Sequence, residues 1–367
     1  MKRIKGFDGL RAIAVTCVFA AHMRPLDIPL STVAVYVFFV LSGFLITGLL
    51  TDQREVIERG RSDRTSELVL FYYRRSLRIF PIYYVTLAGY AAWIWSTSGH
   101  SPAGLWSYIL YVANIWMSTQ SSCQDVLLCH FWSLAIEEQF YIFLAPLLIL
   151  IARSRHMQVV VAVFVTGTLS LILVPALGFN ERQQYLFSTT NFAMLAAGGI
   201  MSLLYRKPLG INLFKPGITG AALVTIIAFL LISGSLRRYS IQLFSLLFLA
   251  TIVSISLVVS WLANHQESRL VKILEWQPLA YLGKVSYGFY LMHPACIHAY
   301  RFLVHWPDSV SRVVPAGALA LFNATACFGI TFLVSHISWQ ILERRILSLR
   351  DTPPPRLLAV RAKPETL

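Results

Sequence analysis

Charge is scarce in this chain, and acidic residues are its rarest part. Its 367 residues include 17 Asp and Glu against 31 Lys and Arg, and charged residues make up 13% of the total. That is too little charge for an ordinary soluble domain. Five cysteines are too few for a disulfide framework. No metal-ligand spacing, nucleotide-binding Gly-rich loop or internal repeat stands out, which argues against those classes of site and fold.

What the chain has instead is apolar sequence. Hydrophobic residues make up 56% of it, and the mean hydropathy is +0.63. Apolar stretches of about 20 residues recur, which predicts an all-α polytopic membrane protein, whereas a β-barrel would show short alternating segments. The shorter aromatic run Trp106 to Met117 is expected to be interfacial or re-entrant. About ten transmembrane helices are predicted, at residues 9–26, 31–50, 78–97, 131–152, 157–177, 187–205, 217–235, 240–262, 279–303 and 316–341.

Basic residues predict the orientation of these helices. With the N-terminus inside, 23 Lys and Arg fall in cytoplasmic segments and 6 in external ones, which favours both termini in the cytoplasm. We therefore interpret the basic residues behind the net charge of +14 mainly as determinants of membrane topology, with some of them available to bind an anionic ligand. No nucleic-acid partner is expected. Residues 1–345 are predicted to form the membrane domain, and residues 346–367 a disordered, basic, Pro-containing tail. The first apolar segment has no small-residue cleavage site, so we expect it to be retained.

The cysteines divide into two groups. Cys17, Cys296 and Cys327 lie in apolar segments, where packing is the simplest role. Cys123 and Cys129 share one polar loop and can pair if that loop faces an oxidising compartment.

The first apolar helix carries two ionisable residues, Arg11 and His22. Eleven residues separate them, so their side chains share one face about 16 Å apart along the axis. Ionisable groups within the membrane are candidates for a functional site. The alternative is that Arg11 is a positive-inside anchor and His22 an interfacial residue.

Other basic residues suggest an anion site. Arg75 and Arg78 lie three residues apart on one helical face at a membrane boundary, where they can bind lipid headgroups or the phosphates of a nucleotide-like cofactor. Lys284 can add to such a site or extend its amine to the membrane surface. His293, just before Pro294, is as compatible with a helix kink or with packing as with chemistry.

Glu137 and Glu138 are the only carboxylates well inside a predicted span. Their helix descends from the outer face, which places them about 10 Å below that surface and level with His22. A histidine and a carboxylate at matching depth can form a base and its orienting partner, as used in acyl transfer. Ser42 and Gly43 are small residues that either allow close helix packing or make room for a ligand.

Six stretches together resemble the acyltransferase 3 family of integral-membrane O-acyltransferases, in order and spacing from residue 6 to about 345. They are Phe7 to Arg11 with His22, Phe38 to Ile46, Arg74 to Pro81, Phe131 to Tyr141, Leu282 to Tyr287, and Ser338 with Trp339 and Glu343. There are two departures. Val-Ala-Val-Tyr stands before Phe38 where the family often shows Gly-Val-Asp, and Arg-Arg follows Glu343 where a Pro is common.

The resemblance implies ten core helices in a bacterial inner membrane, in contact with lipid. It also implies transfer of an acyl group, usually acetyl from acetyl-coenzyme A, to a hydroxyl of a cell-envelope polysaccharide, a glycoside or a macrolide, without a metal. The periplasmic hydrolase-like domain that some relatives carry is not expected. The resemblance ties Arg11, His22, Arg75 and Arg78 to activity. Combined with the residue patterns above, it predicts His22 as base with Glu137 or Glu138 as its orienting partner, Arg11, Arg75, Arg78 and Lys284 at the coenzyme A phosphates, and Asp8, Ser42 and Gly43 at the substrate.

Two other functions are compatible with charges inside the membrane. A transporter or flippase of a glycan or lipid-linked substrate would be expected to show inverted repeats or broken helices around a midplane site, and the sequence shows neither. A catalytically silent scaffold is the third possibility. Release of coenzyme A that depends on an acceptor separates the three.

Overall fold

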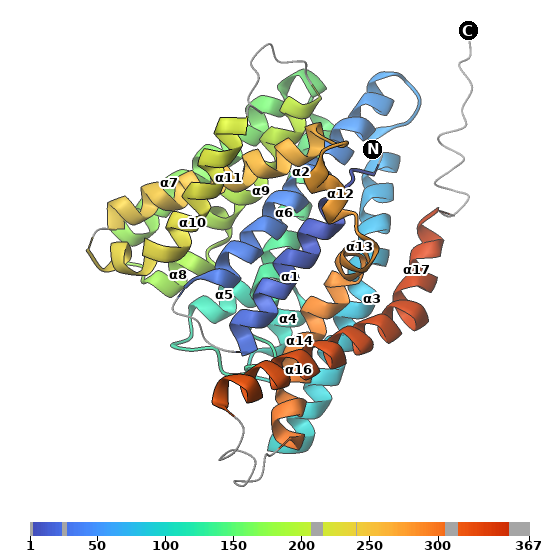
Figure 1. The fold of residues 1–367 in the computed structure, drawn as a ribbon. Helices are drawn as coiled ribbons and strands as arrows, with labels where there is room; N and C mark the ends of the chain where they lie inside the picture. Colours follow the sequence, from blue (N-terminus) through green and yellow to red (C-terminus); the bar gives the residue numbers. More distant parts are fainter. Residues whose placement is uncertain (1–2, 24–27, 207–215, 240, 305–314, 352–367) are drawn as a thin grey trace.

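The computed structural model describes residues 3–23, 28–206, 216–239, 241–304 and 315–351 (Figure 1). Throughout these residues the regular structure is helical, which confirms the all-α prediction. Each of the ten predicted segments contains a long helix. These are α1 (Phe7–Met23), α2 (Leu30–Glu58), α3 (Arg64–Ser98), α6 (Phe131–Leu150), α7 (His156–Ala176), α9 (Ser188–Tyr205), α10 (Pro216–Tyr239), α11 (Ile241–Asn264), α14 (Ser286–Leu303) and α16 (Ala316–Ser338). The shorter helices are α4 (Leu105–Ile109), α5 (Ala113–Ser118), α8 (Glu181–Leu186), α12 (Arg269–Leu274), α13 (Gln277–Lys284) and α17 (Arg344–Ser348).

Several helices have the length and apolar character of membrane spans, as expected of a multi-pass membrane protein. Within the described residues there are five, namely Leu30–Glu58, Phe131–Leu150, Arg153–Ala176, Leu243–Asn264 and Ala316–Ser348. Ten spans, and the orientation of the termini, remain predictions. The run from Trp106 to Met117, expected to be too short to span, forms parts of α4 and α5.

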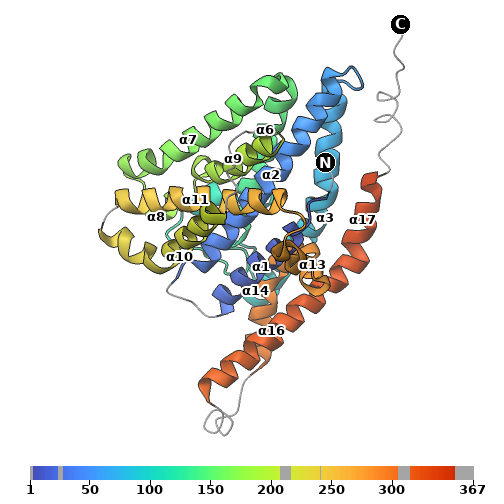
Figure 2. The ribbon, with the colours of Figure 1, turned by 45° about the horizontal axis from the view of Figure 1, so that its top comes forward.

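Helix α2 is central to the packing of the molecule. It contacts α1, α6, α9 and α11, with α7, α9, α10 and α11 on one side and α1, α3, α14 and α16 on the other (Figures 1 and 2). The approach of α2 to α9 depends on glycine. A Cβ on Gly43 would overlap the carbonyl of Leu195, and a Cβ on Gly198 would overlap the carbonyl of Val40. Gly43 therefore has the close-packing role, the first of its two predicted readings.

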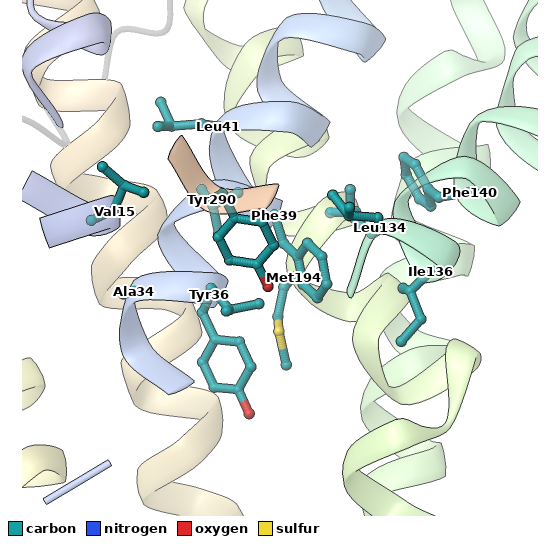
Figure 3. Close-up of a cluster of buried hydrophobic side chains, with 14 of the residues drawn as sticks. Val15, Ala34, Tyr36, Phe39, Leu41, Leu134, Ile136, Phe140, Met194 and Tyr290 are labelled. Atoms are coloured by element: carbon teal, nitrogen blue, oxygen red, sulfur yellow. The ribbon is translucent and has the colours of Figure 1, made fainter. Parts of the chain in front are cut away.

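A cluster of buried side chains joins the two sides of the molecule (Figure 3). Phe39 of α2 packs edge-on against Trp132 of α6, and Phe38 of α2 packs edge-on against Tyr290 of α14. Lipid tails are as apolar as these side chains, so the helices are held by shape and van der Waals contact more than by exclusion of water. The cluster fixes α14 relative to α2 and α6, and α14 carries residues of the candidate site.

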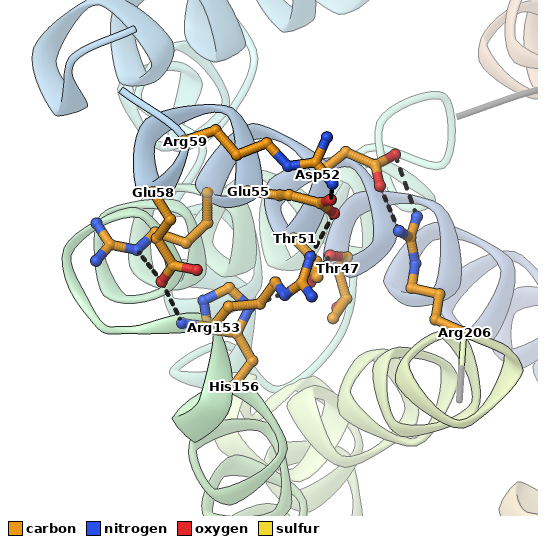
Figure 4. Close-up of polar contacts among 10 residues, drawn as sticks. Thr47, Thr51, Asp52, Glu55, Glu58, Arg59, Arg153, His156 and Arg206 are labelled. Carbon is orange, nitrogen blue, oxygen red and sulfur yellow. Dashed lines mark hydrogen bonds and ion pairs between the residues drawn. The ribbon is translucent and has the colours of Figure 1, made fainter. Parts of the chain in front are cut away.

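The polar stretch after the second predicted span is mostly helical, where a loop was expected. Helix α2 continues to Glu58 because charged residues pair along it, with Arg54 Nε 3.1 Å from the Glu58 carboxylate (Figure 4). Asp63 then caps α3 by accepting hydrogen bonds from the hydroxyl and backbone N–H of Ser66, and these bonds lower its pKa. The third predicted helix therefore begins at Arg64, 14 residues before its predicted start at residue 78.

Two other boundaries differ from the prediction. The ninth predicted span is divided at Val285 into α13 and α14. The last helix continues beyond residue 341 through a π-helical turn, Trp339–Glu343, into α17 and a 3₁₀ turn that ends at Asp351. Residues 346–351 of the predicted tail are thus helical, and residues 352–367 lie outside the described residues.

Cys123 and Cys129 form a disulfide, the pairing that the sequence allowed. Cys296 and Cys327 are buried and Cys17 is partly buried, in agreement with packing roles.

Candidate active site

Helix α1 carries site residues at both of its ends. Asp8 lies in its first turn and accepts a hydrogen bond from Arg11 Nη1 at 2.9 Å. His22 lies in its last turn and is exposed. Eleven residues of helix place Arg11 and His22 about 16 Å apart along the axis. The helix therefore links two regions of different chemistry.

Around Arg11 lies a cation-rich cavity of about 200 Å³, here called the basic pocket. It is formed by α1, α3, α13, α14 and the C-terminal segment, and four of its residues carry positive charge while two carry a carboxylate. Its lining residues are Asp8, Arg11, Arg78, Gly283, Lys284, Tyr287, Trp339, Glu343, Leu347 and Arg350.

The basic pocket combines charges with aromatic faces. The Lys284 ammonium lies 4.9 Å from the centroid of the Trp339 ring. Glu343 is buried and accepts a hydrogen bond from the Ser338 hydroxyl at 3.2 Å. Cations beside aromatic rings suit a nucleotide, because phosphates bind the cations and a base can stack on a ring.

The predicted arginine pair is divided between two surroundings. Arg78 is exposed and lines the basic pocket. Arg75 is not part of the lining. It lies close enough to Arg78 and Glu138 to interact electrostatically with both, and its buried Nε has no hydrogen-bond partner among the described residues. Only Arg78 is thus placed to meet a ligand in the basic pocket as it stands.

The two glutamates lie away from the position that the sequence suggested. Glu137 accepts hydrogen bonds from the hydroxyls of Ser42 and Tyr141. Glu138 is buried, and its Oε1 has no hydrogen-bond partner in the described part of the chain. Glu137 also lies within electrostatic range of Arg11. The glutamates thus belong with the arginines rather than with His22.

The ring of His22 is paired with another histidine. His22 Nδ1 lies 2.7 Å from Nε2 of His293, and the two ring planes are nearly parallel, with centroids 5.0 Å apart. His293 is fully buried on α14, and its Nδ1 lies 2.7 Å from the carbonyl oxygen of Tyr290. The expected partner, Glu137 or Glu138, is therefore replaced by His293.

A third histidine explains why the depth estimate was wrong. His130, which directly precedes α6, is buried with its ring centroid 5.3 Å from that of His293. The prediction placed the start of this helix at the membrane surface, but that start lies at the level of His22. Glu137 is seven residues further along, which is about 10 Å deeper.

The end of α1 beside His22 is held by α14. Arg301 Nη2 donates a hydrogen bond to the carbonyl of Met23 at 2.8 Å. This carbonyl belongs to the last turn of α1, where helical partners are missing and a cation is favourable. The interaction fixes the position from which His22 projects.

The structure brings together several residues that the sequence did not assign to a site. Tyr287, Trp339, Glu343 and Arg350 line the basic pocket, and the first three of these belong to stretches that carried the resemblance. The sequence left the role of His293 open between a helix kink, packing and chemistry. It gave His130, which precedes a predicted helix, no role in a site. Among the described residues, no group of three His, Cys, Asp or Glu side chains is close enough to hold a metal ion.

Comparison with known proteins places the chain in a family. A family model described as an acyltransferase domain, that of acyltransferase 3, matches residues 4–339. The chain belongs to the acyltransferase 3 family. It is thus a member of a family of enzymes that transfer acyl groups.

Relatives of this acyltransferase 3 member match nearly its whole length. It is 27% identical to the peptidoglycan O-acetyltransferase OatA of Listeria monocytogenes, over 94% of this chain and 56% of that protein. It is 28% identical to the O-acetyltransferase OatA of Staphylococcus aureus, over 94% of this chain and 57% of that protein. A putative O-acetyltransferase of Staphylococcus aureus is also 28% identical, with the same coverage. The chain spans a little over half the length of these relatives. No solved structure matches it.

Proposed function

We propose that this acyltransferase 3 member is a membrane O-acetyltransferase, which moves an acetyl group from acetyl-coenzyme A to a hydroxyl of a cell-envelope polysaccharide or glycoside. The observation that carries the proposal is that the two ends of α1 differ in chemistry. The basic pocket lies at Arg11, and His22 is paired with a second histidine. The names of both OatA relatives support an acetyl group, and that of the Listeria monocytogenes relative supports an acceptor of the peptidoglycan class.

The acyl donor is proposed to bind through its nucleotide end in the basic pocket. Arg11, Arg78 and Lys284 would meet the phosphates, and the ring of Trp339 offers a face for the base. A cavity of about 200 Å³ suits a nucleotide fragment rather than the whole donor. The thin pantetheine arm would then extend along α1 toward His22.

In the proposed reaction the acceptor hydroxyl attacks the thioester carbonyl directly. His22 Nε2 takes the hydroxyl proton as the new C–O bond forms, the C–S bond breaks, and the coenzyme A sulfur recovers a proton from the imidazolium. The products are an acetyl ester and free coenzyme A. Ser42 remains a candidate for substrate contact beside Glu137, and Asp8 lies in the basic pocket, at the donor end.

The same proposal sets the protein in the membrane. The basic pocket would open toward the cytoplasm, which holds coenzyme A, and His22 would lie toward the outer face of a bacterial cytoplasmic membrane. Both termini would be cytoplasmic, and about ten helices would cross. The disulfide between Cys123 and Cys129 supports an oxidising compartment for the loop next to His130.

Purified protein in proteoliposomes tests the activity. We expect acetyl-coenzyme A to release free thiol only when a glycan acceptor with free hydroxyls is added. His22→Ala should lower kcat by about 10²–10⁴-fold and leave the KM for the donor near wild type, because a base acts on the chemical step. Movement of the glycan across the membrane without thiol release would instead favour a transporter, and full turnover by His22→Ala would contradict the proposed base.

A further inference from the structure

The contacts of His22 and His293 define a chain of two hydrogen bonds with only one possible direction. Nδ1 of His293 lies 2.7 Å from the Tyr290 carbonyl oxygen, and Nε2 of His293 lies 2.7 Å from Nδ1 of His22. We infer that His293 is a positioning residue that fixes the tautomer of His22 and leaves its Nε2 free to accept a proton. The inference rests on the proposed function, in which His22 is the base.

The first step follows from the proline after His293. In an α-helix the carbonyl of Tyr290 would accept from the backbone N–H of residue 294, but Pro294 has no N–H. The carbonyl is therefore free to accept from the His293 ring. A carbonyl oxygen can only accept, so Nδ1 of His293 must carry its proton.

The second step concerns the charge of His293. A second proton on Nε2 would make the ring a cation, and the ring is 0% exposed. Its described ring neighbours are His22, His130 and Tyr290, none of which supplies a negative charge. A buried charge without an opposite partner is strongly unfavourable. His293 is therefore neutral, and its Nε2 is an acceptor.

The tautomer of His22 follows. Because Nε2 of His293 accepts, Nδ1 of His22 must donate, and the lone pair of a neutral His22 lies on its Nε2. His22 is an exposed residue at the end of α1, whereas His293 is fully buried. When Nε2 takes the proton of the acceptor hydroxyl, Nδ1–H stays bonded to His293 and the ring keeps its orientation.

Two amide substitutions separate this role from simple packing. In His293→Gln the side-chain oxygen can reach the place of Nε2 and accept from His22, whereas the shorter side chain of His293→Asn can reach only the place of Nδ1. His298→Asn, five residues further on the same helix, is the matched control for placing Asn in α14. All variants are compared as full-length protein in proteoliposomes.

We expect His293→Asn to lower kcat by at least about tenfold with little change in the donor KM, and His293→Gln to keep most of the activity. Equal losses in both variants, or no loss in either, would overturn the inference.

The ¹⁵N NMR spectrum of histidine-labelled protein gives a readout that does not need activity. It should show wild-type His22 protonated at Nδ1, and a change toward the other tautomer in His293→Asn but not in His293→Gln. Wild-type His22 protonated at Nε2 would refute the inference even if the enzyme is active, whereas an active His22→Ala would refute the proposed base alone.

Discussion

Two arginines three residues apart on α3 show how strongly the position of a side chain decides its role. Arg78 is exposed in the basic pocket beside Lys284 and Glu343. Arg75 is less exposed than Arg78 and lies near the buried Glu138. A guanidinium at a pocket is available to a phosphate, whereas one beside a buried carboxylate stabilises that carboxylate.

The position of Arg78 predicts that its replacement affects binding of the donor more than the chemical step. Arg78→Ala should raise the KM for acetyl-coenzyme A about ten- to a hundredfold, because a lost charge-assisted hydrogen bond costs about 1.5–3 kcal/mol. Its kcat should change little, because the contact is far from the reacting bond. A phosphate-free thioester, S-acetyl-pantetheine, should be used equally well by Arg78→Ala and wild type.

The control for this substitution is Arg345→Ala, which removes an exposed arginine of α17 that does not line the basic pocket. It should leave the KM for both donors unchanged. If Arg78→Ala impairs the phosphate-free donor as much as acetyl-coenzyme A, Arg78 does not bind the phosphates.

At the residue scale the sequence predicted the placement of side chains along one helix better than their contacts with other helices. The spacing of Arg11 and His22 could be predicted because both lie on one helix, α1. The partner of His22 was missed because it depends on the depth at which α6 begins, and depth is a property of packing between helices. The Pro294 that frees the Tyr290 carbonyl was visible, but its effect on His293 requires the ring orientation.

Among the elements, the contact between α2 and α9 is sensitive to the addition of a single methyl group. Gly43 and Gly198 each lie against a backbone carbonyl of the other helix, and a backbone cannot move as a side chain can. Gly43→Ala and Gly198→Ala should each destabilise the protein by about 1–3 kcal/mol through overpacking. The check is the midpoint of thermal unfolding in detergent, which should fall in both variants.

Gly89→Ala is the matched control, since Gly89 is exposed within α3 and a Cβ there meets nothing within 4 Å. Its unfolding midpoint should not fall, because alanine is the better helix former. A Gly198→Ala variant as stable as wild type would contradict the close approach of the helices.

The elements also show which boundaries a sequence reveals. Each of the ten apolar runs contains a long helix, as expected because an apolar segment in lipid must satisfy its backbone hydrogen bonds internally. The early start of α3 and the break at Val285 were missed, because caps, ion pairs and interhelical contacts decide them where hydropathy does not change.

At the scale of the whole molecule, donor and acceptor would bind at opposite ends of α1 in the proposed reaction. Arg11 and His22 are about 16 Å apart along the axis, so the two substrates need not share a compartment. The basic pocket would receive the donor from the cytoplasm, and His22 would receive the acceptor near the outer face.

Transfer across a sealed membrane tests this claim most directly. Labelled acetyl-coenzyme A is enclosed in proteoliposomes, the glycan acceptor is added outside, and acetyl ester on the external glycan is measured. We expect the external glycan to become acetylated while the donor stays enclosed, and His22→Ala to abolish this transfer. Acetylation that occurs only when donor and acceptor are on the same side would contradict this expectation.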